Sequence, residues 1–270
     1  MKALPAVLLL DLDDTILDDT GARDRCWQTA CVEAAAQRPG LDAERLFGAI
    51  GEVREVFWSD PDRHREWRLR MREAWERIAT DALARVGSDD PALGAFIGQR
   101  HSELRDSAMA PLPGAISTLG RLQSLGVTLG LITNGDSDRQ REKIERFALT
   151  AYFAYIGIEG EVGFGKPHRG AYDSALASLG VTAVECWMVG DKLDWDVAGA
   201  QAVGIRGIWL DRRGAGLPRS STIQPDHVIG SISELLPYAC RHGAGYDRRH
   251  PDAWHTPRTR LPRPHTGRGG

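Results

Sequence analysis

The sequence is poor in cysteine and in long apolar runs. Its 270 residues include four cysteines, which form neither a CxxC pair nor another spacing typical of metal ligands. We therefore expect a reduced, cytoplasmic protein whose thiols are incidental. The apolar stretch Leu4–Leu10 is too short to span a membrane. Because only Lys2 precedes it and acidic residues follow it, the stretch is not expected to be a signal peptide either, and no membrane partner is predicted.

Acidic residues outnumber basic ones outside the end of the chain. The formal net charge is −3, yet seven arginines and two aspartates give residues 241–270 a charge of +5, which leaves −8 on residues 1–240. An acidic body repels a phosphodiester backbone, so no nucleic-acid partner is expected. Residues 239–270 contain too few large apolar side chains to pack, and we predict a disordered basic tail. Four of the eight histidines lie there and are not candidates for catalysis.

The apolar pattern predicts an α/β fold with a doubly wound parallel sheet. Five short, nearly continuous apolar runs are typical of strands buried on both faces. Segments with helical spacing alternate with the later runs, as in βα units. The expected strands are Ala6–Leu12, Val127–Thr133, Tyr155–Ile158, Glu185–Val189 and Gly207–Leu210. The expected helices are Ala115–Leu125, Asp138–Phe147, Arg169–Leu179 and Asp194–Ala202.

A segment without any convincing strand interrupts this alternation. Residues 18–109 are rich in Ala, Glu, Arg, Leu and Trp, which predicts an inserted domain of four antiparallel helices. The expected helices are Ala22–Gln37, Ala43–Trp58, Arg63–Val86 and Pro91–Ala108. Residues 1–17 and 110–238 would then form the core domain around the sheet.

Carboxylates gather where the first strand ends. Asp11 and Asp13, two residues apart in Asp11-Leu12-Asp13-Asp14-Thr15, lie at the edge where open α/β sheets bind ligands. Like charges this close repel one another unless a cation or protons compensate, and a hard divalent ion such as Mg²⁺ suits oxygen ligands. The alternative is that these acids only cap a turn or helix.

Three further polar groups follow later strands. Thr133-Asn134-Gly135 offers side-chain and backbone donors to an anion, although such a sequence after a strand is often only a turn. Lys166 stands in a glycine-flanked loop of a chain that has very few lysines. Asp191 is well placed to complete a magnesium site. Asp194 and Asp196 are suited either to capping the next helix or to supporting this site.

In this order, Asp11-x-Asp13-x-Thr15, Thr133, Lys166-Pro167 and Gly190-Asp191 with Asp196 resemble the four signature motifs of the haloacid dehalogenase-like hydrolases. The resemblance covers about residues 6–235. It implies a Rossmann-like core, and the helical insertion resembles the C1-type cap of the phosphatase branch, subfamily IA. The cap would select the substrate.

The resemblance also implies a mechanism. Asp11 would attack phosphorus and form an aspartyl-phosphate, and Asp13 would act as general acid and then as general base. Asp11, the backbone carbonyl of Asp13, and Asp191 would hold Mg²⁺. The transferring phosphoryl group of a small phosphorylated metabolite would lie against Thr133, Asn134 and Lys166. A monomer or homodimer is expected.

Other activities remain open at this point. A phosphomutase uses both acids and a similar cap. A 2-haloacid dehalogenase uses the first aspartate but lacks the second acid found here as Asp13. A non-catalytic binding protein on the same fold is a further alternative, although all four motifs are intact.

Overall fold

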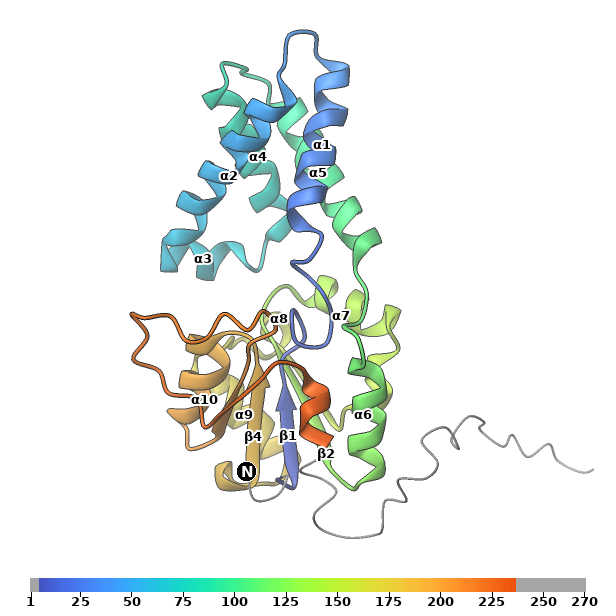
Figure 1. Cartoon of the computed structure of the whole chain (residues 1–270), viewed down its shortest axis with the longest axis vertical. Helices are drawn as coiled ribbons and strands as arrows, with labels where there is room; N and C mark the ends of the chain where they lie inside the picture. The colour runs from blue at the N-terminus through green and yellow to red at the C-terminus, as the bar shows by residue number, and fades with distance from the viewer. Residues whose placement is uncertain (1–4, 237–270) are drawn as a thin grey trace, which may run out of the picture.

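The computed structural model describes residues 5–236, and its centre is a six-stranded sheet in which every pair of neighbouring strands is parallel. The spatial order is β3-β2-β1-β4-β5-β6 (Figure 1). The strands are β1 Val7–Leu10, β2 Thr128–Thr133, β3 Tyr155–Ile158, β4 Cys186–Gly190, β5 Arg206–Leu210 and β6 His227–Ile229. This sheet confirms the predicted α/β class. The predicted tail, residues 239–270, lies outside the described residues.

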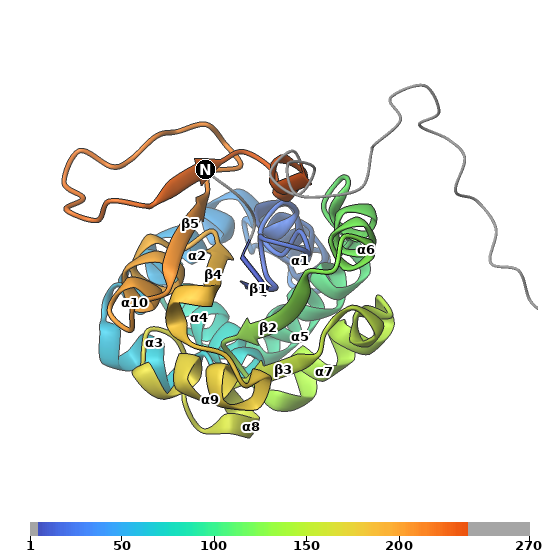
Figure 2. The same cartoon turned by 90° about the horizontal axis from the view of Figure 1, so that it is seen from below.

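Helices cover both faces of the sheet, as the doubly wound arrangement requires. Figure 2 shows α6 and α7 on one side of the strands and α9 and α10 on the other. The helices of the core are α6 Ala115–Ser124, α7 Ser137–Arg146, α8 Glu159–Val162, α9 Arg169–Leu179 and α10 Gly199–Gln201. Short 3₁₀ turns lie at Leu149–Tyr152, Ala183–Glu185 and Ile232–Leu235.

The buried strand β1 shows why both faces must be covered. Leu8 and Leu10 pack in one apolar cluster with residues of α6, whereas Val7 and Leu9 pack in a second cluster with residues of α9. Successive side chains of a strand point to opposite faces, so a continuous apolar run needs a helix on each side. The apolar sequence of β1 therefore places its carboxyl end, and Asp11, in the middle of the sheet.

One predicted helix was wrong in detail, and one strand was missed. The helix expected over Asp194–Ala202 is a π-helix, Leu193–Ala198, followed by α10. The strand β6 was not predicted, because it has only three residues and its sequence, His-Val-Ile, offers too short an apolar pattern to recognise. No helix among residues 5–236 is long and apolar enough to cross a membrane.

Five helices lie between β1 and α6 and form a layer beyond the carboxyl ends of the strands, which we call the cap (Figure 1). They are α1 Arg23–Gln37, α2 Ala43–Ser59, α3 Pro61–Trp67, α4 Met71–Arg85 and α5 Pro91–Ala108. The cap has its own apolar core, which includes Trp27 and Trp75. The predicted boundaries between the core and this segment stay predictions.

The single helix expected over Arg63–Val86 is divided into α3 and α4. The side chain of Asp60 caps α3 by accepting hydrogen bonds from the backbone N–H groups of Asp62 and Arg63. Between the two helices, Arg68 reaches the core and donates to Glu159. This tertiary contact has no signature in the helical periodicity.

His101 of α5 is a buried titratable group in the cap core. Its ring is fully buried, stacks on Trp27 at a centroid distance of 3.7 Å and meets the edge of Trp75 at 5.2 Å. Neither ring nitrogen has a hydrogen-bond partner. Burial, reinforced by Arg105 and other arginines, lowers the pKa of His101 from 6.5 to about 2. The neutral imidazole is therefore the folded form.

We expect His101 to make the free energy of unfolding depend on pH. Below pH 6.5, the ordinary pKa of histidine, His101 binds a proton in the unfolded chain but not in the folded protein, so the free energy of unfolding falls as the pH decreases. The contribution of His101 to the pH dependence of the free energy of unfolding approaches about 1.4 kcal/mol per pH unit. Urea unfolding at several pH values between about 6.5 and 4.5 measures this slope. His101→Phe keeps a stacking ring without a titratable nitrogen and should have a shallower slope; identical slopes would contradict the assignment.

Candidate active site

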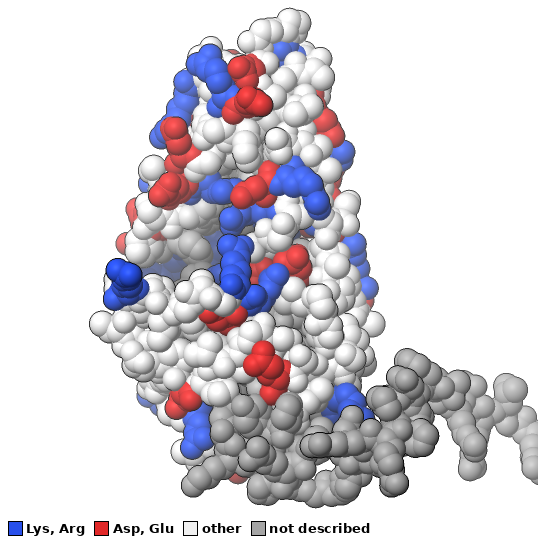
Figure 3. Space-filling model, viewed as in Figure 1, with Lys and Arg blue, Asp and Glu red and all other residues white. Residues whose placement is uncertain are grey.

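The predicted site residues meet at the carboxyl edge of the sheet, because β2, β1 and β4 are neighbours. A cavity of about 630 Å³ lies there between the core and the cap. In Figure 3 the surface is hollowed between these two parts, with Lys and Arg side chains beside the hollow. From the core the cavity is lined by Asp11, Asp13, Thr133, Asn134, Lys166 and Asp191, and from the cap by Trp27, Trp58, Arg68 and Trp75, among others.

Asp11 and Lys166 form an ion pair in the floor of this cavity. The Lys166 side chain is 1% exposed, and its Nζ lies 2.6 Å from Asp11 Oδ1 and 2.6 Å from Asp196 Oδ1. Thr15 Oγ1 donates to the other oxygen, Asp11 Oδ2, at 3.3 Å. Backbone pairing of Asp11 N–H with the carbonyl of Val189 at 3.0 Å holds the residue beside β4. Asp11 is thus oriented at both carboxylate oxygens.

The Asn134 side chain fastens the loop that carries Lys166. Its Nδ2 donates to the Lys166 carbonyl at 2.7 Å, and its Oδ1 accepts from the Lys166 N–H at 2.7 Å. Thr133 is 2% exposed, and its hydroxyl accepts a hydrogen bond from Gln140 Nε2. The last residue of β2 and the residue after it therefore have different surroundings: Thr133 lies in the cavity wall, and the Asn134 amide is hydrogen-bonded to Lys166.

The three acids after β4, Asp191, Asp194 and Asp196, have different surroundings. Asp196 is fully buried, and its two oxygens contact Lys166 Nζ and the Lys192 N–H, the latter at 2.9 Å. Gly190 permits this packing, because a Cβ there would come within 2.2 Å of Asp196. Asp194 is exposed. Asp191 Oδ1, in contrast, is buried without a hydrogen-bond partner.

This arrangement fits a hard cation. Ligand oxygens of Asp11, Asp191 and Asp196 lie within 4.8 Å of one another. The unpartnered Asp191 Oδ1 supplies the kind of oxygen that Mg²⁺ prefers. Asp11 and Asp191 stay the predicted side-chain ligands, and of the three acids it is Asp191 that has an oxygen without a hydrogen-bond partner. The backbone carbonyl of Asp13 stays a predicted ligand.

Burial dominates the titration of these acids. It raises the pKa of Asp11 to about 8, against the opposing charge of Lys166, and the pKa of Asp191 to about 6, against that of Lys192. Burial also opposes the charge on Lys166, but Asp11 and Asp196 raise its pKa above the ordinary value. The lysine is therefore cationic, and a second cation nearby would favour ionised Asp11 and Asp191.

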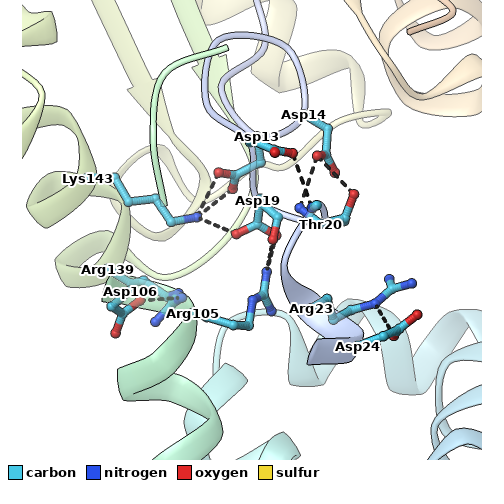
Figure 4. Close-up of polar contacts among 12 residues, drawn as sticks. Asp13, Asp14, Asp19, Thr20, Arg23, Asp24, Arg105, Asp106, Arg139 and Lys143 are labelled. Carbon is cyan, nitrogen blue, oxygen red and sulfur yellow. Dashed lines mark hydrogen bonds and ion pairs between the residues drawn. The ribbon is translucent and has the colours of Figure 1, made fainter. Parts of the chain in front are cut away.

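Two residues of α7 that sequence reasoning missed contact Asp13. Lys143 Nζ lies 2.8 and 2.7 Å from the two oxygens of Asp13 (Figure 4). Gln140 Nε2 lies 3.2 Å from Asp13 Oδ2. Gln140 and Lys143 are three positions apart and share a face of the helix. The available signal was the scarcity of lysine: Lys143, Lys166 and Lys192 are the lysines among residues 5–236, and all three line this cavity.

The sequence comparisons agree with this geometry. A family model described as haloacid dehalogenase-like hydrolase matches residues 5–204. The chain belongs to this family. It is 34% identical to a phosphoserine phosphatase of Thermus thermophilus, over 85% of this chain and 97% of that protein. It is 29% identical to a glyceraldehyde 3-phosphate phosphatase of Methanopyrus kandleri, over 85% of this chain and 94% of that protein.

Solved structures share the fold. A putative hydrolase of this family from Bacillus subtilis, bound to magnesium, superposes with a TM-score of 0.69 and 22% identity, over 87% of this chain and 99% of that chain. An L-2-haloacid dehalogenase of Xanthobacter autotrophicus superposes with a TM-score of 0.58 and 19% identity, over 89% and 100% of the two chains. At these identities the likeness shows the fold alone.

We expect Asp191→Asn to weaken Mg²⁺ binding by about tenfold or more, because the amide removes a charged ligand. Asp194→Asn is the matched control: it removes an exposed acid three residues away and should change the affinity by less than about twofold. Isothermal titration of each variant with MgCl₂, without substrate, measures both. Equal affinities for wild type and Asp191→Asn would refute the ligand assignment.

Proposed function

We propose that the protein is a magnesium-dependent phosphatase that hydrolyses a small phosphorylated metabolite through an aspartyl-phosphate on Asp11. The observation that carries the proposal is the buried Asp11–Lys166 pair beside the open oxygen of Asp191, at the base of a cavity with room for a phosphate and a small leaving group. Curated relatives of about this chain's length are named as phosphatases of phosphoserine and of glyceraldehyde 3-phosphate.

In the first step a carboxylate oxygen of Asp11 attacks phosphorus, the bond from phosphorus to the ester oxygen breaks, and Asp13 gives a proton to that oxygen. Lys166 stabilises the charge of the phosphoryl oxygens from its place beside Asp11, and Thr133 offers a hydroxyl from the cavity wall. In the second step Asp13 takes a proton from water, which attacks the aspartyl-phosphate and regenerates Asp11.

Mg²⁺ held by Asp11 and Asp191 would offset the repulsion between the anionic nucleophile and the phosphate, which is its usual contribution to phosphoryl transfer. The orphaned Asp191 Oδ1 supports this assignment. The role of Asp196 is to orient Lys166, because it is fully buried and its two oxygens contact Lys166 Nζ and the Lys192 N–H.

The cap excludes water and selects the leaving group. Arg68, in the turn between α3 and α4, donates from Nε and NH2 to Glu159 of the core at 2.5 to 3.1 Å. Glu159 is 7% exposed and also accepts from the Gly135 N–H at 3.0 Å, next to Thr133 and Asn134. His64 meets Trp195 of the core edge-on at 5.1 Å. These contacts hold the cap against the phosphate-binding loop.

Phosphatase activity accounts for the site better than the alternatives. Asp13 lies in the cavity, so the second acid that a dehalogenase lacks is present where it can reach a substrate. A mutase uses the same two acids, so the distinction rests on the product: free phosphate for a phosphatase, an isomerised phosphoester for a mutase.

We expect Asp11→Asn to abolish phosphate release while the protein stays folded, because the amide is not a nucleophile. The assay measures inorganic phosphate from phosphoserine, glyceraldehyde 3-phosphate, a pyrimidine 5′-nucleotide and p-nitrophenyl phosphate, with Mg²⁺ and again with excess chelator. Asp138→Asn, which alters an exposed acid of α7, should keep wild-type activity. Full activity of Asp11→Asn, or wild-type activity that survives chelation, would contradict the proposed reaction.

Removal of the Arg68 side chain should open the cap. We expect Arg68→Met to lower kcat/KM by roughly tenfold, since closure completes the site, and to enlarge the radius of gyration in small-angle scattering without substrate. Arg72→Met is the control, because Arg72 is exposed on α4. An unchanged kcat/KM and an unchanged radius would show that the contact with Glu159 does not hold the cap closed.

A further inference from the structure

Lys143 lines the cavity, but it belongs to none of the four sequence motifs and has no role in the mechanism described above. It projects from α7, its side chain is 8% exposed, and its ammonium contacts both oxygens of Asp13 at 2.7 and 2.8 Å. A fully exposed lysine would lose little on becoming unpaired, but a buried ammonium must be matched by an anion. Its position is therefore tied to Asp13, the acid that transfers protons in the proposed reaction.

The same ammonium also reaches the connection to the cap. Lys143 Nζ lies 3.5 Å from Asp19 Oδ1, and the other oxygen of Asp19 contacts Arg105 of α5 (Figure 4). Arg105 additionally donates to the Asp19 carbonyl at 2.9 Å. Burial opposes the charge on Asp19, but Lys143, Arg105 and Arg139 hold its pKa well below the ordinary value. The carboxylate of Asp19 is thus a fixed anion and a second partner of the Lys143 ammonium.

Gln140 is the second residue of α7 that contacts Asp13, and it also contacts Thr133. Its Nε2 contacts Asp13 Oδ2 at 3.2 Å and Thr133 Oγ1 at 2.5 Å, so one amide links the proton-transfer acid to the phosphate-binding hydroxyl. Asp13 is therefore held from one helix by two donors. Only Lys143 among the two carries a charge that can compensate the Asp13 carboxylate.

We propose that Lys143 is a positioning residue for leaving-group departure, which it serves by holding Asp13 and neutralising the carboxylate left when Asp13 gives up its proton. This inference rests on the proposed function. As phosphorus–oxygen bond cleavage puts negative charge on the ester oxygen, the proton moves from Asp13 to that oxygen, and the negative charge comes to rest on Asp13 beside Lys143. Asp19 and Arg105 keep the ammonium in place for this step.

This role predicts a dependence on the leaving group. An alkoxide is a poor leaving group and needs a proton, whereas p-nitrophenolate leaves without one. General acid catalysis contributes about 10²-fold or more where it is needed. Loss of Lys143 should therefore reduce hydrolysis of alkyl phosphates much more than hydrolysis of p-nitrophenyl phosphate. A lysine that only supports the fold would affect both substrates alike.

The experiment measures kcat/KM, which reports the steps up to formation of the phosphoenzyme, for Lys143→Met with two esters. One is p-nitrophenyl phosphate, and the other is the alkyl phosphate of the assay panel that the wild type hydrolyses fastest. We expect kcat/KM for the alkyl ester to fall by about 10²-fold and that for the aryl ester by less than about threefold. Lys143→Arg keeps the charge and should restore part of the alkyl activity.

Arg141→Met is the matched control, since it removes a cation of the same helix whose partner, Glu161, lies outside the cavity. It should leave both esters unaffected. Equal losses for both esters in Lys143→Met, or no loss for either, would overturn the positioning role while the phosphatase function stands. A wild type that releases phosphate from neither ester would overturn the proposed function, and with it this inference.

Discussion

The site depends on one buried lysine shared by two buried carboxylates. The Lys166 ammonium lies 2.6 Å from a carboxylate oxygen of Asp11 and 2.6 Å from one of Asp196. In the sequence Lys166 is 155 residues from Asp11 and 30 residues from Asp196. Removal of charges from water is costly, and the two ammonium groups of Lys166 and Lys192 do not neutralise the three carboxylates of Asp11, Asp191 and Asp196. The remaining negative charge makes the site receptive to a cation, and the bound lysine keeps Asp11 oriented for attack. The same balance of charge thus supports both metal binding and catalysis.

The parallel sheet brings Asp11, Lys166 and Asp196 together. The strands β1 and β4 are adjacent, so the residues that follow them emerge side by side at one edge. The loop with Lys166 is brought to the same place by the hydrogen bonds between Asn134 and the Lys166 backbone. Asn134, which the sequence predicted as a phosphate ligand, therefore also fixes the position of Lys166 between Asp11 and Asp196.

A second set of ion pairs joins the core to the cap. Arg68 meets Glu159 at one side of the cavity, and Arg105 meets Asp19 at the connection between the two parts. Both pairs are largely buried, and removal of one partner from such a pair is costly. The chemistry near Asp13 and the position of the cap are consequently linked through Lys143, which contacts Asp13 and Asp19 together.

The sequence by itself determined five of the six strands, most of the helices beside them and the edge at which Asp11, Asp13, Lys166 and Asp191 meet. Apolar runs specify buried strands, and polar residues directly after them are placed by the strand ends, so this much follows from local pattern. Only the tertiary structure decided that Lys143 and Gln140 face Asp13, that Arg68 contacts Glu159 from between two helices, and that Asp196 rather than Asp194 is buried. Helical periodicity shows which residues share a face, but what that face contacts is settled when the cap and the core pack together.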